Sequence, residues 1–397
     1  MRNVFKDFEK TILVILKSKF KWILLLYLLL LFRISFIQED GSGLGKIIQV
    51  ITIFGMCFYS LKYKKGKNLI AYSYVNTNIS VKSCLMLYSY GVLSALWAYL
   101  PQFAFFLAIQ NVILILVCIW LYSNFTTFEN TERAFLYLCL ATMLFEFISY
   151  RLVVSGSLMV HYLPNASSAA LVISYCVGEL FAKKKMSQIR LHLLKMMLLV
   201  SVLILITSTS SGANASAIFG IAVACFFSGK IIWALLVVVI SFILYCNPEL
   251  VSQIIFFIMP GKTKESIESA TGRDLIWDAI KEFSNQRPVF GWGYGCVERI
   301  ASDRYNLNVP DAHNNYIGFK GSLGFVGLSI AIFHFITTFM IMVKYRMKAG
   351  YIGLISAFAC AMLNGYSYGF LSGKACSITI IYMSLIVLTF FYSKKMI

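Results

Sequence analysis

The chain has 397 residues, of which 59% are apolar and only 13% are charged, and its mean hydropathy is +0.77. A soluble domain is nearer half apolar and a quarter charged, so the composition excludes an ordinary soluble protein and predicts an integral membrane protein. The net charge of +18 would point to nucleic acid in a soluble protein. Basic residues gather in the cytoplasmic loops of membrane proteins, however, and we therefore expect no nucleic-acid partner.

Apolar runs of roughly 17–25 residues predict membrane-spanning helices. Twelve such runs lie at 22–37, 46–62, 83–100, 103–122, 134–155, 166–182, 192–209, 213–229, 231–247, 315–343, 350–367 and 375–393. No small-residue cleavage site follows the first run, so we interpret it as a retained span rather than a signal peptide. The predicted fold class is an all-α polytopic membrane protein. Residues 1–247 would hold the first nine spans, 248–314 a large extracytoplasmic loop, and 315–397 the last three spans.

The distribution of basic residues predicts that both termini are cytoplasmic. In that orientation the inner segments hold 23 of the 35 Lys and Arg residues, as the positive-inside rule requires. The inner turn at 123–133 fits least well, because Glu129 and Glu132 accompany a single arginine there.

The loop at 248–314 is the one long outer connection, with 7 basic and 9 acidic side chains. Because the other outer loops are short, we expect outer-face chemistry to reside in it. Its segment at 270–295, "ATGRDLIWDAIKEFSNQRPVFGWGYG", predicts a helix followed by a glycine-rich turn, and Pro288 ends the helix. Thr271 and Asp274 have the spacing of a capping box.

Arg273 falls in the first turn of this predicted helix, where the helix dipole disfavours a cation. An arginine in such a position points to an anionic ligand. A solvated surface arginine is the plainer interpretation of the stretch by itself.

The segment "VPDAHNNYIGFKGSLG" at 309–324 predicts the start of the tenth span, with Asp311 as its N-cap. His313 would then lie in the first helical turn at the outer surface. The positive end of the dipole would keep it neutral and able to accept a proton. A histidine that caps nearby backbone is an equally good interpretation of this stretch alone. The glycines at 318, 321, 324 and 327 favour close helix packing over phosphate binding.

Several basic residues depart from the positive-inside trend and fall near the outer ends of spans. They are Arg33, Lys46, Arg151, Lys320 and Lys374. Cations in such positions are costly unless they are paired, and Glu146 in the fifth span is one available partner. The functional alternative is a basic, outward-open pocket for an anionic lipid head group, since arginine can bind phosphate through two parallel hydrogen bonds.

The ordered set of Gly272–Arg273, Trp277, "RPVFGWGYG" at 287–295 and "DAHNNYIGFKGSLGFVG" at 311–327 resembles the O-antigen polymerase/ligase family of bacterial membrane glycosyltransferases. The pattern runs through about 55 residues. The twelve predicted spans, with one large outer loop before the tenth, resemble the family over nearly the whole chain.

The resemblance implies a GT-C-like enzyme of the bacterial inner membrane, with its active site on the periplasmic face. Such an enzyme moves a glycan from undecaprenyl diphosphate to an acceptor hydroxyl and needs no metal or other cofactor. Its partners would be the lipid-linked donor and acceptor, membrane lipid and a chain-length regulator protein.

By the same resemblance, Arg273 would hold the diphosphate and His313 would support attack of the acceptor. Arg287, Arg151 and Lys320 would add positive charge. Asn314 and Tyr294 would position sugar or phosphate.

One departure from the family favours a polymerase of O-antigen or capsular repeat units over an O-antigen ligase. Ligases usually carry an arginine in the turn after the seventh span, but here that turn reads "STSSGANAS" at 208–216. Arg151 is the residue that could supply the missing charge. From another class, a lipid-linked glycan flippase is also compatible with the span count. Transporters tend to contain internal repeats and interrupted helices, however, and the sequence shows neither.

Overall fold

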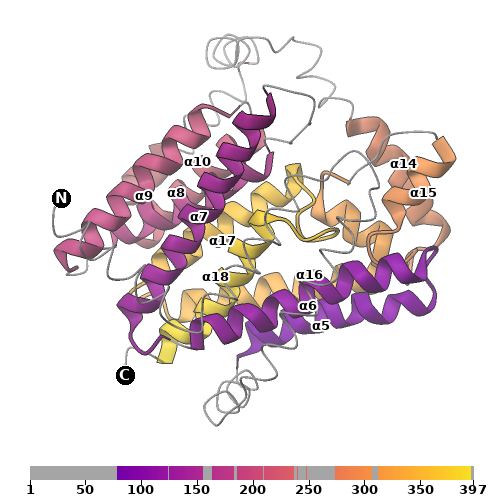
Figure 1. Ribbon diagram of the computed structural model, residues 1–397, viewed down its shortest axis with the longest axis horizontal. Coiled ribbons are helices and arrows are strands. Elements are labelled where there is room, and N and C mark those ends of the chain that lie inside the picture. The colour runs from indigo at the N-terminus through magenta and orange to yellow at the C-terminus, as the bar shows by residue number, and fades with distance from the viewer. Residues whose placement is uncertain are drawn as a thin grey trace.

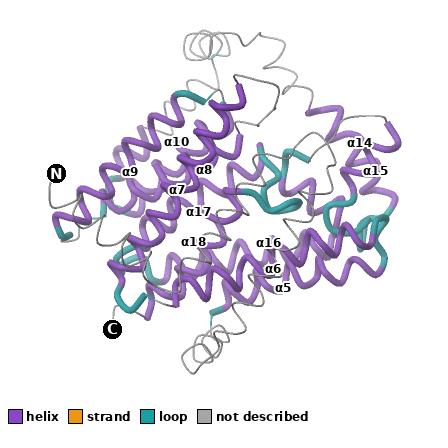
Figure 2. Tube along the Cα trace, viewed as in Figure 1, coloured by secondary structure: helices purple, strands orange, loops and turns teal. Residues whose placement is uncertain are grey.

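The computed structural model describes residues 78–123, 125–154, 163–182, 186–208, 210–236, 273–305 and 312–394, together with residues 239 and 247. Within these segments the secondary structure is entirely helical, and Figure 2 shows helices joined by loops. The predicted spans at 22–37 and 46–62, and most of 231–247, lie outside the described residues.

Nine of the predicted spans correspond to helices in the described part of the chain. They are α5 (Ile79–Leu93), extended by the 3-10 turn η1 (Ser94–Leu96), α6 (Pro101–Ser123), α7 (Phe128–Val154), α8 (Leu163–Phe181), α9 (Gln188–Ile206), α10 (Ser211–Phe227), α16 (Asn315–Lys344), α17 (Tyr351–Ser367) and α18 (Ser377–Lys394). Two shorter helices, α14 (Arg273–Gln286) and α15 (Val297–Tyr305), belong to the predicted outer loop. The expected helix before Pro288 is therefore present, and its expected capping residue Thr271 lies outside the described segments.

Four of the described helices are long and apolar enough to cross a membrane: Ile79–Leu96, Pro101–Ser123, Gln188–Ile206 and Asn315–Lys344. Three shorter apolar helices accompany them at Ser211–Phe227, Tyr351–Ser367 and Ser377–Ser393. This composition indicates a polytopic membrane protein. The total of twelve spans and their orientation stay predictions.

The helices are arranged around α17 and α18, which occupy the centre of Figure 1. One side is formed by α5, α6 and α16, which run side by side, and the other by α7, α8, α9 and α10. The helices of the outer loop, α14 and α15, pack on α16 at one end of the bundle. A helix that is apolar all round belongs in an interior, and α18 fits this rule because its side chains from Ser377 to Tyr392 are buried. In contrast, α9 exposes Leu199, Leu203 and Ile206, as a lipid-facing helix does.

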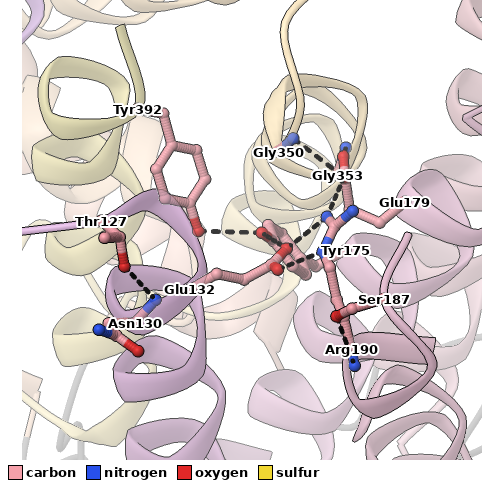
Figure 3. A network of polar contacts seen from close by, with 10 residues as sticks. All are labelled: Thr127, Asn130, Glu132, Tyr175, Glu179, Ser187, Arg190, Gly350, Gly353 and Tyr392. Atoms are coloured by element: carbon pink, nitrogen blue, oxygen red, sulfur yellow. Dashed lines mark hydrogen bonds and ion pairs between the residues drawn. The ribbon is translucent and has the colours of Figure 1, made fainter. Parts of the chain in front are cut away.

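A buried ion-pair network joins several helices at the end of the bundle opposite α14 and α15 (Figure 3). Arg190 of α9 donates to Glu132 of α7 at 2.5 and 2.7 Å and to Glu179 of α8 at 2.6 Å. Glu179 also accepts from the backbone N–H groups of Gly350 and Gly353 at 2.9 Å each. Arg190 and Glu132 lie in segments that the charge pattern places on the inner side, and Glu179, Gly350 and Gly353 lie at span ends next to such segments. The acidic residue that fitted the 123–133 turn poorly is thus paired with a basic residue of the next inner segment.

At the other end, α16 is broken at Gly324, whose φ of 67° is not helical. The glycine-rich turn at 288–293 docks on this break through four backbone hydrogen bonds. They run from Trp292 to Gly321 (3.3 Å), Gly293 to Ser322 (2.8 Å), Phe325 to Pro288 (2.8 Å) and Val326 to Val289 (3.2 Å). A broken helix has free carbonyls on one side of the break and free N–H groups on the other. The turn donates its N–H groups to the free carbonyls of α16 and accepts from the free N–H groups of α16.

The glycines of both segments permit this close approach. A Cβ at Gly324 would lie 2.2 Å from the Val289 carbonyl oxygen, and one at Gly291 would lie 2.5 Å from the Ser322 carbonyl. At Gly318 and Gly321 an added Cβ would meet Ser372 and Val297 side chains. The expectation that the glycine series serves packing is confirmed for these positions, with Gly324 serving a helix break as well.

Candidate active site

The structure brings the neighbourhoods of Arg273 and His313 together. Arg273 is the first residue of α14, and its Nη1 donates to the carbonyl oxygen of Ser367 at the end of α17, at 2.9 Å. One turn later, Trp277 Nε1 donates to the carbonyl oxygen of Ala312 at 2.9 Å. Residues four apart share a helix face, so the face of α14 that carries Arg273 is held directly against the residue that precedes His313. Both Arg273 and His313 are half-buried.

The local conformation of His313 differs from the expected one. We predicted Asp311 as the N-cap and His313 within the first helical turn. The N-cap is instead Asn314, whose side-chain oxygen accepts from the backbone N–H groups of Tyr316 at 2.9 Å and Ile317 at 3.1 Å. His313 therefore precedes the helix, with a φ of 48°, and it is the only non-glycine residue with a positive φ in the described part of the chain.

This backbone conformation is sparsely populated by residues other than glycine, although histidine and asparagine adopt it more often than most. Residues held in such conformations are enriched at functional sites, because the surrounding structure must over-determine them. Here, the bond from Trp277 to Ala312 fixes the chain on one side of His313, and the Asn314 cap fixes it on the other.

Asn314 and Asn315 both have structural partners and are 1% exposed. The cap of α16 occupies the Asn314 side-chain oxygen. Asn315 accepts the backbone N–H of Leu371 at 2.7 Å, which attaches the turn at 368–376 to the start of α16. The predicted contact of Asn314 with sugar or phosphate stays a prediction, and its geometry gives it a role in the fold.

Tyr294 is fully buried and its hydroxyl faces the same turn. It donates to the carbonyl oxygens of Leu371 at 2.7 Å and Gly373 at 3.1 Å, and it accepts from Asn111 Nδ2 at 3.1 Å. We predicted that Tyr294 positions substrate. In the structure its hydroxyl binds the 368–376 turn and its ring is buried, so Tyr294 holds this turn, and the predicted contact with substrate stays a prediction.

Arg287 lies far from Arg273. The two arginines are fourteen residues apart along α14 and its C-terminal extension, which corresponds to about 20 Å at the helical rise. The Arg287 guanidinium stacks over the Trp292 ring, 4.0 Å from its centroid, and donates to the Trp97 carbonyl at 3.3 Å. No contact brings Arg287 to the Arg273–His313 region among the described residues, so a single diphosphate is not shared by both arginines in this arrangement.

The structure says less about the positions of the other predicted basic residues relative to Arg273. Lys320 is half-buried on α16 with its Nζ 5.3 Å from the Phe325 ring centroid, and none of its contacts among the described residues reaches Arg273. Arg151 lies in the last turn of α7, within a stretch whose side chains are outside the described part of the structure. Lys374 is exposed on the 368–376 turn.

The 368–376 turn lies next to the candidate site, and the sequence analysis did not predict its position. It is held by Asn315 and Tyr294, and by the Tyr88 hydroxyl, which donates to Leu371 at 3.3 Å. The turn directly follows Ser367, the residue that binds Arg273. Its sequence, "YGFLSGKAC", offered a signal in two glycines and a lysine between two apolar runs.

Cys296, in the predicted outer loop, is buried. Its Sγ lies 3.7 Å from the Leu100 carbonyl oxygen, and burial raises the pKa of the thiol to about 11, so the sulfur stays protonated at neutral pH. Within the described segments, no group of three or more His, Cys, Asp or Glu side chains is placed to hold a metal ion.

Comparison with known proteins supports the resemblance drawn from the motifs. Residues 196–332 match the family model described as O-antigen ligase, a region that runs from α9 to α16 and includes Arg273 and His313. The O-antigen polymerase/ligase family is thereby confirmed as the one that the chain resembles, over about a third of its length. No curated protein matches the chain.

Proposed function

From this resemblance to the O-antigen polymerase/ligase family, we propose that the protein is a glycosyltransferase that polymerises O-antigen or capsular repeat units. The donor would be a growing glycan on undecaprenyl diphosphate, and the acceptor a hydroxyl of a lipid-linked repeat unit. We place the reaction at the outer face of a bacterial inner membrane, in a GT-C-like bundle with both termini cytoplasmic.

The observation that carries the proposal is the attachment of the Arg273 face of α14 to the residue beside His313, through Trp277 and Ala312. This arrangement gives one region a permanent cation and an imidazole, which are the two groups that the reaction needs. In the proposed step, the acceptor oxygen forms a bond to the anomeric carbon while the bond from that carbon to the diphosphate oxygen breaks. The diphosphate leaves with the bonding electrons, and the acceptor proton passes to a base.

Arg273 would neutralise the charge that develops on the departing diphosphate. An oriented group of this kind contributes about 3–4 kcal/mol to transition-state stability in other enzymes. His313 would orient the acceptor hydroxyl or take its proton, an effect typically of about 10²–10⁴-fold in rate. Lys374 and Lys320 supply further positive charge at this end of the bundle, and Arg287, by its position, would contact a different part of the substrate or the lipid surface.

A ligase that transfers glycan to the lipid A core is the second candidate, because the matched family model carries that description. The segment where ligases usually have an arginine includes Gly212 of α10, which packs against Ser367, the partner of Arg273. A Cβ at Gly212 would lie 2.2 Å from Ser367 Oγ. This segment is thus next to the proposed diphosphate site, and its lack of a cation favours the polymerase.

A strain that lacks the gene tests the proposal. A polymerase predicts that lipopolysaccharide or capsule carries single repeat units, whereas a ligase predicts that lipid-linked polymer accumulates without being attached. A flippase predicts that repeat units stay on the cytoplasmic side. Transfer of glycan by the purified protein in detergent, where no sealed membrane exists, would rule out transport as the whole function.

A further inference from the structure

An exposed apolar surface lies where the connection between α5 and α6 meets the glycine-rich turn of the outer loop. Tyr99 donates its backbone N–H to the Trp292 carbonyl at 2.8 Å. Trp97 Nε1 donates to the Phe290 carbonyl at 3.1 Å, so the two segments form one continuous surface. The exposed side chains of both segments, which we call the hairpin-tip surface, are Leu93, Leu96, Tyr99, Leu100, Val289 and Phe290.

The hairpin-tip surface lies between the ends of two membrane-spanning segments. Ile79–Leu96 is long and apolar enough to cross a membrane, and its last residue is 84% exposed. The next such segment begins at Pro101. The residues between them therefore lie where hydrocarbon meets water, a position in which tryptophan and tyrosine are enriched in membrane proteins. Trp97 and Tyr99 are residues of these types.

Two exposed arginines accompany this surface. The Arg287 guanidinium donates to the Trp97 carbonyl and stacks over the Trp292 ring. The Arg299 guanidinium, on α15, lies 5.3 Å from the centroid of the Phe103 ring, in the first turn of α6. Each cation is thus held against an aromatic ring, one in the glycine-rich turn and the other in the α5–α6 hairpin.

Neither arginine belongs to an ion pair within the segments that the structure describes. Asp303 follows Arg299 by one turn of α15, and no ion pair joins them. A guanidinium that stacks on an aromatic ring keeps its N–H donors at the edge of the plane, where they can meet an oxyanion. At the end of a membrane span, the available oxyanion is the phosphate of a lipid head group.

We propose that the hairpin-tip surface, together with Arg287 and Arg299, binds anionic phospholipid in the leaflet on the side of α14 and α15. The head-group phosphate would meet the arginines, and the acyl chains would cover the apolar side chains. Phospholipid bound there would attach the glycine-rich turn, and with it the break in α16, to the membrane surface. The inference goes beyond the proposed transferase function and does not depend on it.

The exposed side of α5 favours lipid over a soluble protein partner. Ile79, Met86 and Leu93 are exposed and seven residues apart, so they form one stripe along the helix. This stripe ends at the hairpin-tip surface. A soluble partner would cover only the end of an apolar stripe that continues into the membrane, whereas a lipid covers both the stripe and its end.

The test is a titration of the purified full-length protein in detergent with phosphatidylglycerol and, separately, with phosphatidylcholine of the same acyl chains. The wild type should bind the anionic lipid more tightly. Each arginine near an anionic lipid surface should change the affinity by about fivefold. The double variant Arg287→Gln/Arg299→Gln should therefore bind phosphatidylglycerol about 25-fold more weakly and phosphatidylcholine as the wild type does.

Lys281→Gln/Arg304→Gln is the matched control, because it removes the same charge from exposed positions on α14 and α15. It should bind both lipids normally. Arg287→Lys/Arg299→Lys keeps the charge and should bind phosphatidylglycerol nearly as tightly as the wild type. A loss in this lysine variant as large as in the glutamine variant would overturn the inference, because it would show that the arginines only support the fold.

Two further outcomes would also overturn the inference. One is equal affinity of the wild type for phosphatidylglycerol and phosphatidylcholine. The other comes from undecaprenyl diphosphate as a third probe. If Arg287→Gln/Arg299→Gln loses its binding as strongly as that of phosphatidylglycerol, the surface holds the lipid-linked substrate and not the phospholipid of the membrane.

Discussion

Arg273 and Ser367 join the first residue of α14 to the last residue of α17 through a 2.9 Å hydrogen bond from Nη1 to the carbonyl oxygen. A helix C-terminus is an anionic partner, since its last carbonyls are unpaired and the dipole is negative there. The contact fixes one nitrogen of the guanidinium, and a planar guanidinium has further donors that can face a phosphate.

We therefore expect Arg273→Lys to be almost as damaging as Arg273→Ala. A lysine ammonium is a compact charge that cannot bind Ser367 and a diphosphate with the geometry of a guanidinium. Both variants should lower the transfer rate by about 10²–10³-fold. The measurement is polymer laddering in cells with protein abundance determined in parallel. Arg287→Lys is the control, and a larger loss for Arg287→Lys than for Arg273→Lys would contradict the proposed division of roles.

The His313→Gly variant should show how much the activity depends on the imidazole, without disturbing the unusual backbone conformation at this position. The positive φ of 48° strains a side-chain-bearing residue and suits glycine, so this variant should fold at least as well as the wild type. We expect a loss of transfer of about 10²–10⁴-fold at normal protein levels. His313→Asn, which tolerates the same backbone, is the matched control for loss of side-chain bulk and should be nearly as inactive. Chain lengths like those of the wild type in either strain would exclude His313 from the mechanism.

Tyr294→Phe should destabilise the protein rather than alter substrate affinity. The change removes the donor to Leu371 and Gly373 within a fully buried site, at a cost of about 1–3 kcal/mol. The thermal midpoint in detergent should fall, while the apparent affinity for lipid-linked glycan stays unchanged. Tyr366→Phe, at an exposed position on α17, is the control and should leave the midpoint where it is. An unchanged midpoint with weaker glycan binding for Tyr294→Phe would instead support a substrate role.

Comparing Gly324→Ala with Gly229→Ala separates two destabilising effects, the strain of a positive φ and the clash of an added Cβ with neighbouring backbone. Both residues have a positive φ, 67° and 73°, so an alanine is strained at either by about 1–2 kcal/mol. Only at Gly324 would the added Cβ meet backbone, at 2.2 Å from Val289, whereas Gly229 has open space. We expect Gly324→Ala to abolish the folded protein and Gly229→Ala to lower its thermal midpoint slightly. Similar abundance of the two variants would show that the docked turn is dispensable.

Arg190→Met should be among the most destabilising changes in the half of the bundle opposite α14 and α15. It leaves Glu132 and Glu179 buried beside each other without their cation, at a cost of about 3–5 kcal/mol. Lys281→Met removes the cation of the exposed pair with Asp278 and should cost no more than about 1 kcal/mol. Thermal unfolding of both variants in the same detergent compares the two costs directly, and equal midpoints would mean that the buried network contributes nothing.

Apolar length and periodicity were enough to predict nearly every described helix, because the membrane requires long apolar segments with internally paired backbone. The N-cap of α16 was predicted three residues too early, at Asp311 instead of Asn314. Asp311 and Asn314 are both good caps by residue type, and the choice is made by distant contacts. Trp277 holds the chain at Ala312, and Asn315 must face Leu371. Such contacts leave no local signature.

The candidate site could be predicted only in part, because several of its contacts join residues that are far apart in the sequence. The order of the motifs placed Arg273 and His313 in one loop, and in the structure Trp277, one turn after Arg273, binds the residue that precedes His313. Tyr294 was assigned to substrate only because the resemblance to the family implies that role. Its hydroxyl partner is Leu371, 77 positions away. A single sequence does not show contacts at that distance, and the 368–376 turn was missed with them.

The docking of the 288–293 turn on the break in α16 also constrains how the protein is made. The turn lacks hydrogen-bond partners until Gly321, Ser322, Phe325 and Val326 are present, and α16 cannot bend at Gly324 without the turn. During synthesis residues 288–293 emerge well before α16 is complete. The turn can therefore take its final conformation only after α16 has formed, so the candidate site beside the start of α16 assembles late in synthesis.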